Sequence, residues 1–376
     1  MIKNRIENIY NLGVKELWSL IRDPILLILI AFTFTASVYT AATAVPDGLQ
    51  NASIAVIDED RSTLSERIQG AFYPPQFTSP DEITLSEMDS GLDRGEYTFA
   101  LNIPPSFQQD LLGNRQPTMQ LNIDATRMTQ GFTGNMIINQ IINAEVREYL
   151  KRERIDADLP VNIVERMRFN PNLTASWFGA INEVINLVTM LSIILTGAAV
   201  IRERERGTIE HLLVMPLTPF EIMLSKVWAM GLVVLIASSL SLIFVVQGAL
   251  DVPIEGSILL FIFGAALNLF ATTSIGIYLA TIARNMPQFG MLLLLVLVPL
   301  QMLSGGMTPR ESMPELIQNI MLLAPTTHFI ELGKAILFRG AGLTIVWPSM
   351  LYLILIGVAF FYFANRRFKN TIGQMA

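Results

Sequence analysis

The 376-residue sequence contains no cysteine and only two histidines, His211 and His328. These absences exclude disulfides, thiolate zinc sites, iron–sulfur clusters and cysteine nucleophiles, and we expect no metal centre in this chain. Charged residues make up 15% of the chain, against about 25% in soluble domains, and the net charge is −6. The composition therefore argues against a purely soluble protein, and the small acidic excess argues against a nucleic-acid-binding protein.

Long stretches without Asp, Glu, Lys or Arg are abundant instead. Five of them exceed the about 20 apolar residues that a helix needs to cross a bilayer, and a sixth is interrupted only by Glu183 near its start. We therefore predict an α-helical polytopic membrane protein with six transmembrane helices. The expected spans are 24–45, 176–201, 227–249, 257–282, 288–304 and 343–364.

Lysine and arginine residues beside the spans predict the orientation, because cytoplasmic flanks carry an excess of them. With a cytoplasmic N-terminus, the inside flanks hold 12 such residues and the short outer loop at 250–256 holds none. We predict cytoplasmic termini, a cytoplasmic segment at 202–226, a cytoplasmic loop at 283–287 and a tail at 365–376. A signal peptide cleaved at Ala42-Thr43-Ala44 is the alternative for the first span, but its apolar run exceeds the usual length of about 15 residues.

Residues 1–23 are patterned as an amphipathic helix. Apolar or small residues recur on one face, with Trp18 beside it and charged residues around the rest: Ile2, Ile6, Ile9, Gly13, Leu17 and Ile21. Such a helix lies in the membrane interface. The pattern leaves open whether it is a simple anchor or an elbow helix that packs beside the bundle.

The polar part of the chain lies between the first two spans, where the stretch 46–176 holds 30 of the 58 charged residues. Apolar runs at 52–57, 97–103 and 119–123 predict strands. Helices are expected at 62–72, 106–113 and 129–154, with Ser62 and Ser106 as N-caps of the first two. This alternation predicts a large α/β extracytoplasmic domain at 46–175.

The region 305–342, between the fifth and sixth spans, is too apolar for a free loop yet is repeatedly interrupted. The interrupting motif consists of Ser304, Gly305, Gly306, Pro309, Pro314 and Pro325. Ser312 with Pro314 is expected to begin one short helix, and Thr327 another. Helices of about ten residues are too short to span a bilayer, so we predict re-entrant or interfacial helices.

Glu183 is the ionisable residue that falls inside an expected span, and Asn182 and Asn186 lie on the same side of that helix. Ionisable residues within spans often mark a transport pathway. The alternative is structural pairing near the outer surface, since Trp177 and Phe178 resemble interface aromatics. Neutral polar residues such as Asn268 are explained by hydrogen bonds between helices.

The cytoplasmic segment after the second span combines charges, a glycine and an apolar edge. The residues concerned are Arg202, Glu203, Arg204, Glu205, Arg206, Gly207, Thr208, Glu210, Leu212 and Leu213. Gly207 permits a sharp turn, and Thr208 can cap a following helix. The pattern indicates either a protein interface or a charge cluster that only enforces orientation.

These motifs, taken in order, resemble the ABC-2 type permeases of ATP-binding cassette transporters, in the bacterial drug-export subgroup. The resemblance covers nearly the whole chain. It is carried by residues 55–60 with Ser62 and Ser65, 97–104 with Phe107, 122–124, 202–210 with Leu212, Leu213 and Pro216, 304–306 with Pro309, 313–314 and 325–328.

The resemblance implies a membrane subunit of an ABC exporter for lipophilic or drug-like substrates in the bacterial inner membrane. It implies that residues 202–213 couple to a separate ATPase subunit that binds ATP and Mg, and that two permease halves, identical or different, associate. This chain lacks a phosphate-binding loop and is not expected to be an enzyme or to bind a cofactor. A periplasmic adaptor is an open question, and a secondary transporter or a receptor with a periplasmic sensory domain is the alternative function.

Overall fold

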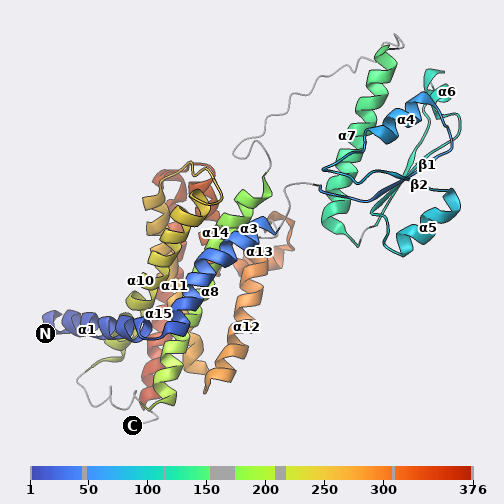
Figure 1. The fold of residues 1–376 in the computed structure, drawn as a ribbon. Helices are drawn as coiled ribbons and strands as arrows, with labels where there is room; N and C mark the ends of the chain where they lie inside the picture. Colours follow the sequence, from blue (N-terminus) through green and yellow to red (C-terminus); the bar gives the residue numbers. More distant parts are fainter. Residues whose placement is uncertain are drawn as a thin grey trace. The chain divides into compact units, whose positions relative to one another are not determined.

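The computed structural model describes residues 2–44, 49–113, 115–124, 126–152, 174–207, 217–306 and 310–373. The chain divides into two compact units (Figure 1). One comprises Met1–Val45 and Ser176–Ala376, and the other comprises Pro46–Ala175. The first unit is helical, and the second holds the strands of the described residues.

The helical unit begins with α1 (Ile2–Ile21) and with α2 (Pro24–Phe32), which continues through the π-helical η1 (Thr33–Ser37) into α3 (Val38–Thr43). Next come α8 (Ala175–Glu205), α10 (Pro219–Ser241) with the π-helical η2 (Leu242–Gln247), α11 (Ile258–Ile282) and α12 (Met286–Leu303). The last elements are the 3₁₀ turn η3 (Arg310–Ser312), α13 (Glu315–Met321), α14 (Pro325–Leu337) and α15 (Leu343–Gly373).

Six helices among the described residues are long and apolar enough to cross a membrane, which matches the expected number. They are Pro24–Thr43, Ser176–Glu205, Pro219–Gln247, Ile258–Ile282, Met286–Leu303 and Leu343–Lys369. The chain is therefore consistent with a polytopic membrane protein.

Several of these helices extend beyond the expected spans. Helix α8 continues to Glu205 and α10 begins at Pro219, so both ends of the expected 202–226 segment belong to long helices. Charge counting misses such extensions because long charged side chains at a helix end reach the interface without ending the helix. Thr218 instead marks the start of α10, where its Oγ1 accepts the Glu221 N–H at 3.3 Å and proline follows at the first helical position.

Helix α8 is the most enclosed of the six, with 78% of its apolar window buried, whereas α12 has 11% of its window buried. Small residues allow α11 to approach α8 closely, because a Cβ at Gly276 would lie 2.6 Å from the Ile193 carbonyl oxygen. Asn268 donates to Thr189 Oγ1 at 3.2 Å across this interface, which confirms its expected role in bonding between helices.

The region between α12 and α15 contains the short helices expected there, with different starts. Helices α13 and α14 meet at an 87° bend. Ser312 lies in η3 rather than at the start of a helix, and Pro314 occupies the N-cap of α13. Helix α14 begins at Pro325 and not at Thr327, because the fixed φ of proline suits the first helical position.

The second unit is a four-stranded sheet with helices on both faces. Its elements are β1 (Ile54–Asp58), α4 (Thr63–Gly70), β2 (Asp81–Glu82), α5 (Leu85–Asp93), β3 (Phe99–Ile103), α6 (Phe107–Leu112), β4 (Gln120–Ile123) and α7 (Met128–Arg152). The strand order is β2-β1-β3-β4, and only β4 is antiparallel to its neighbour. Helices α4 and α7 cover one face and α5 covers the other (Figure 1).

The two serine caps expected in this unit have different outcomes. Ser62 caps α4 as expected, since its Oγ accepts the Ser65 N–H at 3.1 Å while Ser65 Oγ accepts the Ser62 N–H at 2.8 Å. Ser106 occupies the expected N-cap position of α6, but the expected capping bond is not formed. That residue follows two prolines with a φ of 63° and makes no capping bond, and Asp60 accepts the Gln108 N–H at 3.1 Å instead.

Candidate functional site

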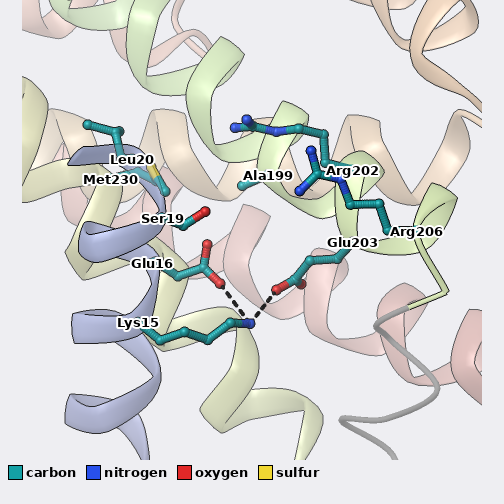
Figure 2. A pocket seen from close by; sticks show the side chains of 9 residues that line it. All are labelled: Lys15, Glu16, Ser19, Leu20, Ala199, Arg202, Glu203, Arg206 and Met230. Carbon is teal, nitrogen blue, oxygen red and sulfur yellow. Dashed lines mark hydrogen bonds and ion pairs between the residues drawn. The ribbon is translucent and has the colours of Figure 1, made fainter. Parts of the chain in front are cut away.

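Four charged side chains meet where α1, α8 and α10 converge, and we call Lys15, Glu16, Glu203 and Lys226 the charge cluster. Lys226 Nζ lies 2.9 Å from Glu16 Oε1 and 2.7 Å from Glu203 Oε2. Lys15 Nζ approaches the same two carboxylates, at 3.0 Å from Glu203 Oε1 and 3.7 Å from Glu16 Oε1 (Figure 2). Two ammonium groups and two carboxylates therefore balance one another.

Because Lys226 and Glu16 are buried, their pairing is important for the stability of the fold. The Lys226 side chain is 2% exposed and Glu16 is 9% exposed, whereas Lys15 is 52% exposed. A buried ammonium group is costly unless it is paired, and removal of one partner from a buried pair typically costs about 3–5 kcal/mol. The cluster therefore holds the ends of three helices in one arrangement.

Helix α1 reaches the cluster because it packs along α10. Trp228 Nε1 donates to the Ile9 carbonyl at 3.1 Å, and a Cβ at Gly13 would overlap the Trp228 ring. The packed face therefore carries Ile9, Gly13, Glu16 and Leu20. Of the expected apolar face, Ile9 and Gly13 contact α10, whereas Ile6 is 63% exposed.

Sequence reasoning missed the charge cluster. It counted Lys226 only as an orientation signal, because a lysine next to an apolar run is typical of a cytoplasmic flank. Two signals were available. Thr218 and Pro219 begin a helix about two turns before Lys226, and Glu16 lies on the same helical face as Gly13 and Leu20.

The end of α8 is also fixed on its other side. Arg202 pairs with Asp23 at 3.3 Å. Arg204 donates to the carbonyl oxygens of Ala280, in the last turn of α11, and of Ala283, the C-cap residue of that helix. Glu205 accepts the Met286 N–H, at 2.8 Å, at the start of α12. A cation on a helix C-terminus and a carboxylate on a helix N-terminus both complement the helix dipole.

The remaining residues of the expected coupling segment begin at the turn after α8. Arg206 lines a cavity of about 140 Å³ beside the charge cluster, together with Arg202 (Figure 2). Gly207 has a φ of +67°, which is the left-handed conformation that glycine adopts without strain. The other expected coupling residues lie outside the described residues: Thr208, Glu210, Leu212 and Leu213.

The opposite end of α8 brings together two expected groups that are far apart in sequence. Asn182 Nδ2 donates to the Gly306 carbonyl at 3.3 Å, and a Cβ at Gly306 would lie 4.0 Å from Asn186 Oδ1. Two of the three pathway candidates, Asn182 and Asn186, therefore face the motif after α12. Within the described part of the chain, Glu183 beside them makes no recorded ion pair.

A second pocket, of about 440 Å³, lies at this end between α8, the turn after α12 and α14, and we call it the α14 pocket. Its walls include Ser304, Gly305, Gly306 and Thr327. Pro325, also in the expected motif, begins α14, whereas Pro309 lies outside the described residues. Among the described residues, no group of three acidic or histidine side chains is placed to hold a metal ion.

Comparison with known proteins gives a consistent result over the chain length. The family model described as "ABC-2 family transporter protein" matches residues 17–365. The chain is 60% identical over 371 residues to the Inner membrane transport permease YhhJ of Escherichia coli (strain K12), covering 99% of each protein. It is 28% identical over 360 residues to the Probable multidrug ABC transporter permease YbhR of the same organism, covering 91% of this chain and 93% of that protein.

Proposed function

Because this chain belongs to the ABC-2 family of transporter proteins, we propose that it is the permease subunit of an ATP-driven exporter. In this proposal it moves lipophilic or drug-like substrates outward from the cytoplasm or the inner leaflet. The printed name of the relative YbhR supports a multidrug role. The excess of Lys and Arg beside one set of helix ends supports cytoplasmic termini and a periplasmic α/β unit.

The energy would come from a separate ATPase subunit, since the sequence has no phosphate-binding loop. Residues 202–213 would contact that subunit, and ATP and Mg would be held there and not by this chain. Two permease halves, identical or different, would face each other, and a periplasmic adaptor would contact the α/β unit if one takes part.

One observation carries the coupling proposal. The end of α8 is bonded to α1 and α10 through the charge cluster, and to α11 and α12 through Arg204 and Glu205. A displacement of this end by the ATPase would therefore move five helices together. Helix α8 has 31 residues, which is about 45 Å of continuous helix, so the displacement would reach Asn182 and the α14 pocket.

The test is capture of the ATPase by the full-length chain, purified in mild detergent from its native host. Wild type is expected to retain a stoichiometric protein that contains a phosphate-binding loop. Gly207→Val, which cannot easily adopt the left-handed turn, and Glu210→Lys are expected to lose it. Gly342→Val is the matched control, since open space surrounds Gly342 and its φ is not positive.

Retention of the ATPase and of export by both coupling variants would refute the coupling site. Absence of any ATPase from wild type under several mild conditions would refute the proposal that a separate ATPase subunit drives this permease. Glu183 would then become the next residue to change, as the ionisable candidate of a secondary transporter.

A further inference from the structure

The α14 pocket is lined by two buried hydroxyl groups that have no hydrogen-bond partner among the described residues. Ser304 is 2% exposed and Thr327 is 4% exposed, and the Oγ atom of each is unpartnered. Several other buried hydroxyls in the bundle are satisfied, as in Thr196 Oγ1, which donates to the Ser192 carbonyl at 2.7 Å. The hydroxyls of Ser241 and Thr326 are also without a partner in the described part of the chain, but neither residue lines the α14 pocket. Unsatisfied buried polar groups are rare and call for an explanation such as a ligand.

Positive charge predominates around these hydroxyls. Arg310, Lys334 and Arg339 line the pocket, and the acidic residue among its lining side chains is the exposed Glu331. The Arg310 Nε atom is buried without a partner, and no carboxylate is recorded in ion-pair contact with Arg310 or Arg339 in the part of the chain that the structure describes. Lys334 donates to the Gly305 carbonyl at 2.7 Å, which keeps its ammonium group at the pocket wall.

The first turn of α14 lies at the pocket, because Thr327 belongs to both. The N-cap position holds Ala324, which makes no capping bond, and Thr327 lies in this turn. The first N–H groups of a helix have no partner within the helix and carry a partial positive charge. An anion held by Thr327 and Ser304 would therefore lie beside a helix end that favours negative charge.

Apolar surface adjoins these polar groups. Phe178 lines the pocket and is 43% exposed. The last two turns of α12, just before Ser304, expose Val298 by 49% and Met302 by 55%, one turn apart. The pocket volume of about 440 Å³ is in the lower part of the range for small-molecule sites, which suits a head group and not a whole lipid.

We propose that the α14 pocket binds the anionic head group of an amphiphile, a phosphate or a carboxylate, with its hydrocarbon part along the exposed surface of α12. Ser304 and Thr327 donate hydrogen bonds to the head group, and Arg310 neutralises it. A cationic head group is disfavoured, because three cations face one acid. This site requires no ATPase and stands independently of the proposed export function.

The test uses full-length protein in phosphatidylcholine nanodiscs, with spin-labelled phosphatidylglycerol as the probe and spin-labelled phosphatidylcholine as the neutral comparison. Electron paramagnetic resonance measures the immobilised fraction. Wild type is expected to prefer phosphatidylglycerol. Arg310→Gln is expected to weaken that preference about tenfold, as the loss of one charge-assisted hydrogen bond would. Arg22→Gln, which removes an exposed cation at the other end of the unit, is the control and should leave it unchanged.

Two further variants separate binding from misfolding and from general surface charge. The double variant Ser304→Ala with Thr327→Val keeps the net charge and is expected to weaken the preference to a similar extent. Glu331→Gln removes the opposing carboxylate and is expected to strengthen it, which a misfolded protein would not do. Equal retention of the probe by wild type and the double variant would overturn the proposal.

A competition experiment identifies the source of the anion. Unlabelled phosphatidylglycerol is expected to displace the probe, whereas soluble sn-glycerol 3-phosphate at the same concentration is not. Equal displacement by the soluble phosphate would show a free-anion site and would overturn the role given to the apolar surface. Stronger immobilisation of a spin-labelled cationic lipid than of phosphatidylglycerol would overturn the charge assignment.

Discussion

The two ends of helix α8 differ in whether the buried polar and charged groups around them have bonding partners. At the end that carries Glu203, the buried Lys226 lies between two carboxylates, and Arg202, Arg204 and Glu205 each bond to a neighbouring element, although the Arg204 Nε atom itself is buried without a partner in the part of the chain that the structure describes. At the end that carries Phe178, two buried hydroxyls and the Arg310 Nε atom have no partner among the described residues. Paired buried charges fix the positions of the helices that carry them, whereas buried donors without a partner can bind an acceptor group of a ligand. The first end is thus suited to transmit a movement and the second to bind a ligand.

The largest expected effect on stability follows from removing Lys226 from the charge cluster. Lys226→Ala leaves Glu16 and Glu203 without their buried partner and should lower the free energy of unfolding by about 3–5 kcal/mol. Lys15→Ala removes an exposed lysine from the same cluster and should cost less than about 1 kcal/mol. Unfolding in mixed micelles of increasing denaturing detergent measures both, and equal losses would contradict the assigned burial.

The contact between α1 and α10 is the next to test. Gly13→Ala places a methyl group against the Trp228 ring, and overpacking of this kind costs about 1–3 kcal/mol. Gly290→Ala is the matched control on α12, because nothing lies within 4 Å of a Cβ there. The same unfolding titration should show a loss for the first variant and none for the second. A neutral Gly13→Ala would mean that α1 does not pack on α10.

Removing a hydroxyl group with a partner and one without a partner should change stability by smaller amounts. Ser192 donates to Thr272 Oγ1 at 2.6 Å between α8 and α11, so Thr272→Val should destabilise the bundle by about 0.6 kcal/mol. Thr327→Val removes a hydroxyl without a partner and should be neutral or stabilising in the ligand-free protein. A larger loss for Thr327→Val in lipid-free detergent would mean that its hydroxyl is structural.

The smallest expected effect lies in the α/β unit, where charges are exposed. Hydrogen bonds from the Thr84 N–H and hydroxyl hold the pKa of Glu87 below its usual value. A depressed pKa stabilises the folded state above the pKa of the unfolded chain, and that stabilisation is lost as the pH falls through the folded pKa. Glu87→Gln should therefore lower stability at neutral pH and have little effect at strongly acidic pH. A constant difference across the pH range would exclude this carboxylate as the cause.

The sequence predicted the number of long apolar helices and the family, because both depend on extended patterns. Runs without charge identify apolar helices, and the motifs that carry the resemblance lie between Ala55 and His328, within the matched residues 17–365. Helix ends were less predictable. Arg204 and Glu205 continue α8 because their side chains bond to neighbouring helices, which a hydropathy pattern does not register.

The site was only partly predictable for the same reason. Asn182 and Gly306 were singled out separately, and the structure brings them together. The partnership of Lys226 with Glu16 joins residues 210 positions apart in the chain, and no local pattern marks such a pair. Strand β2 and helix α5 were missed because the short, polar run around Asp81 and Leu85 has no clear period.

The most direct test of the different roles proposed for the two ends of α8 is to measure both properties on the same variants. ATPase capture and phosphatidylglycerol retention would be measured for Gly207→Val and for the double variant Ser304→Ala with Thr327→Val. We predict that the first variant loses the ATPase and keeps the lipid, and that the second loses the lipid and keeps the ATPase. Loss of both properties in both variants, or loss of neither, would contradict the division of α8 into a coupling end and a binding end.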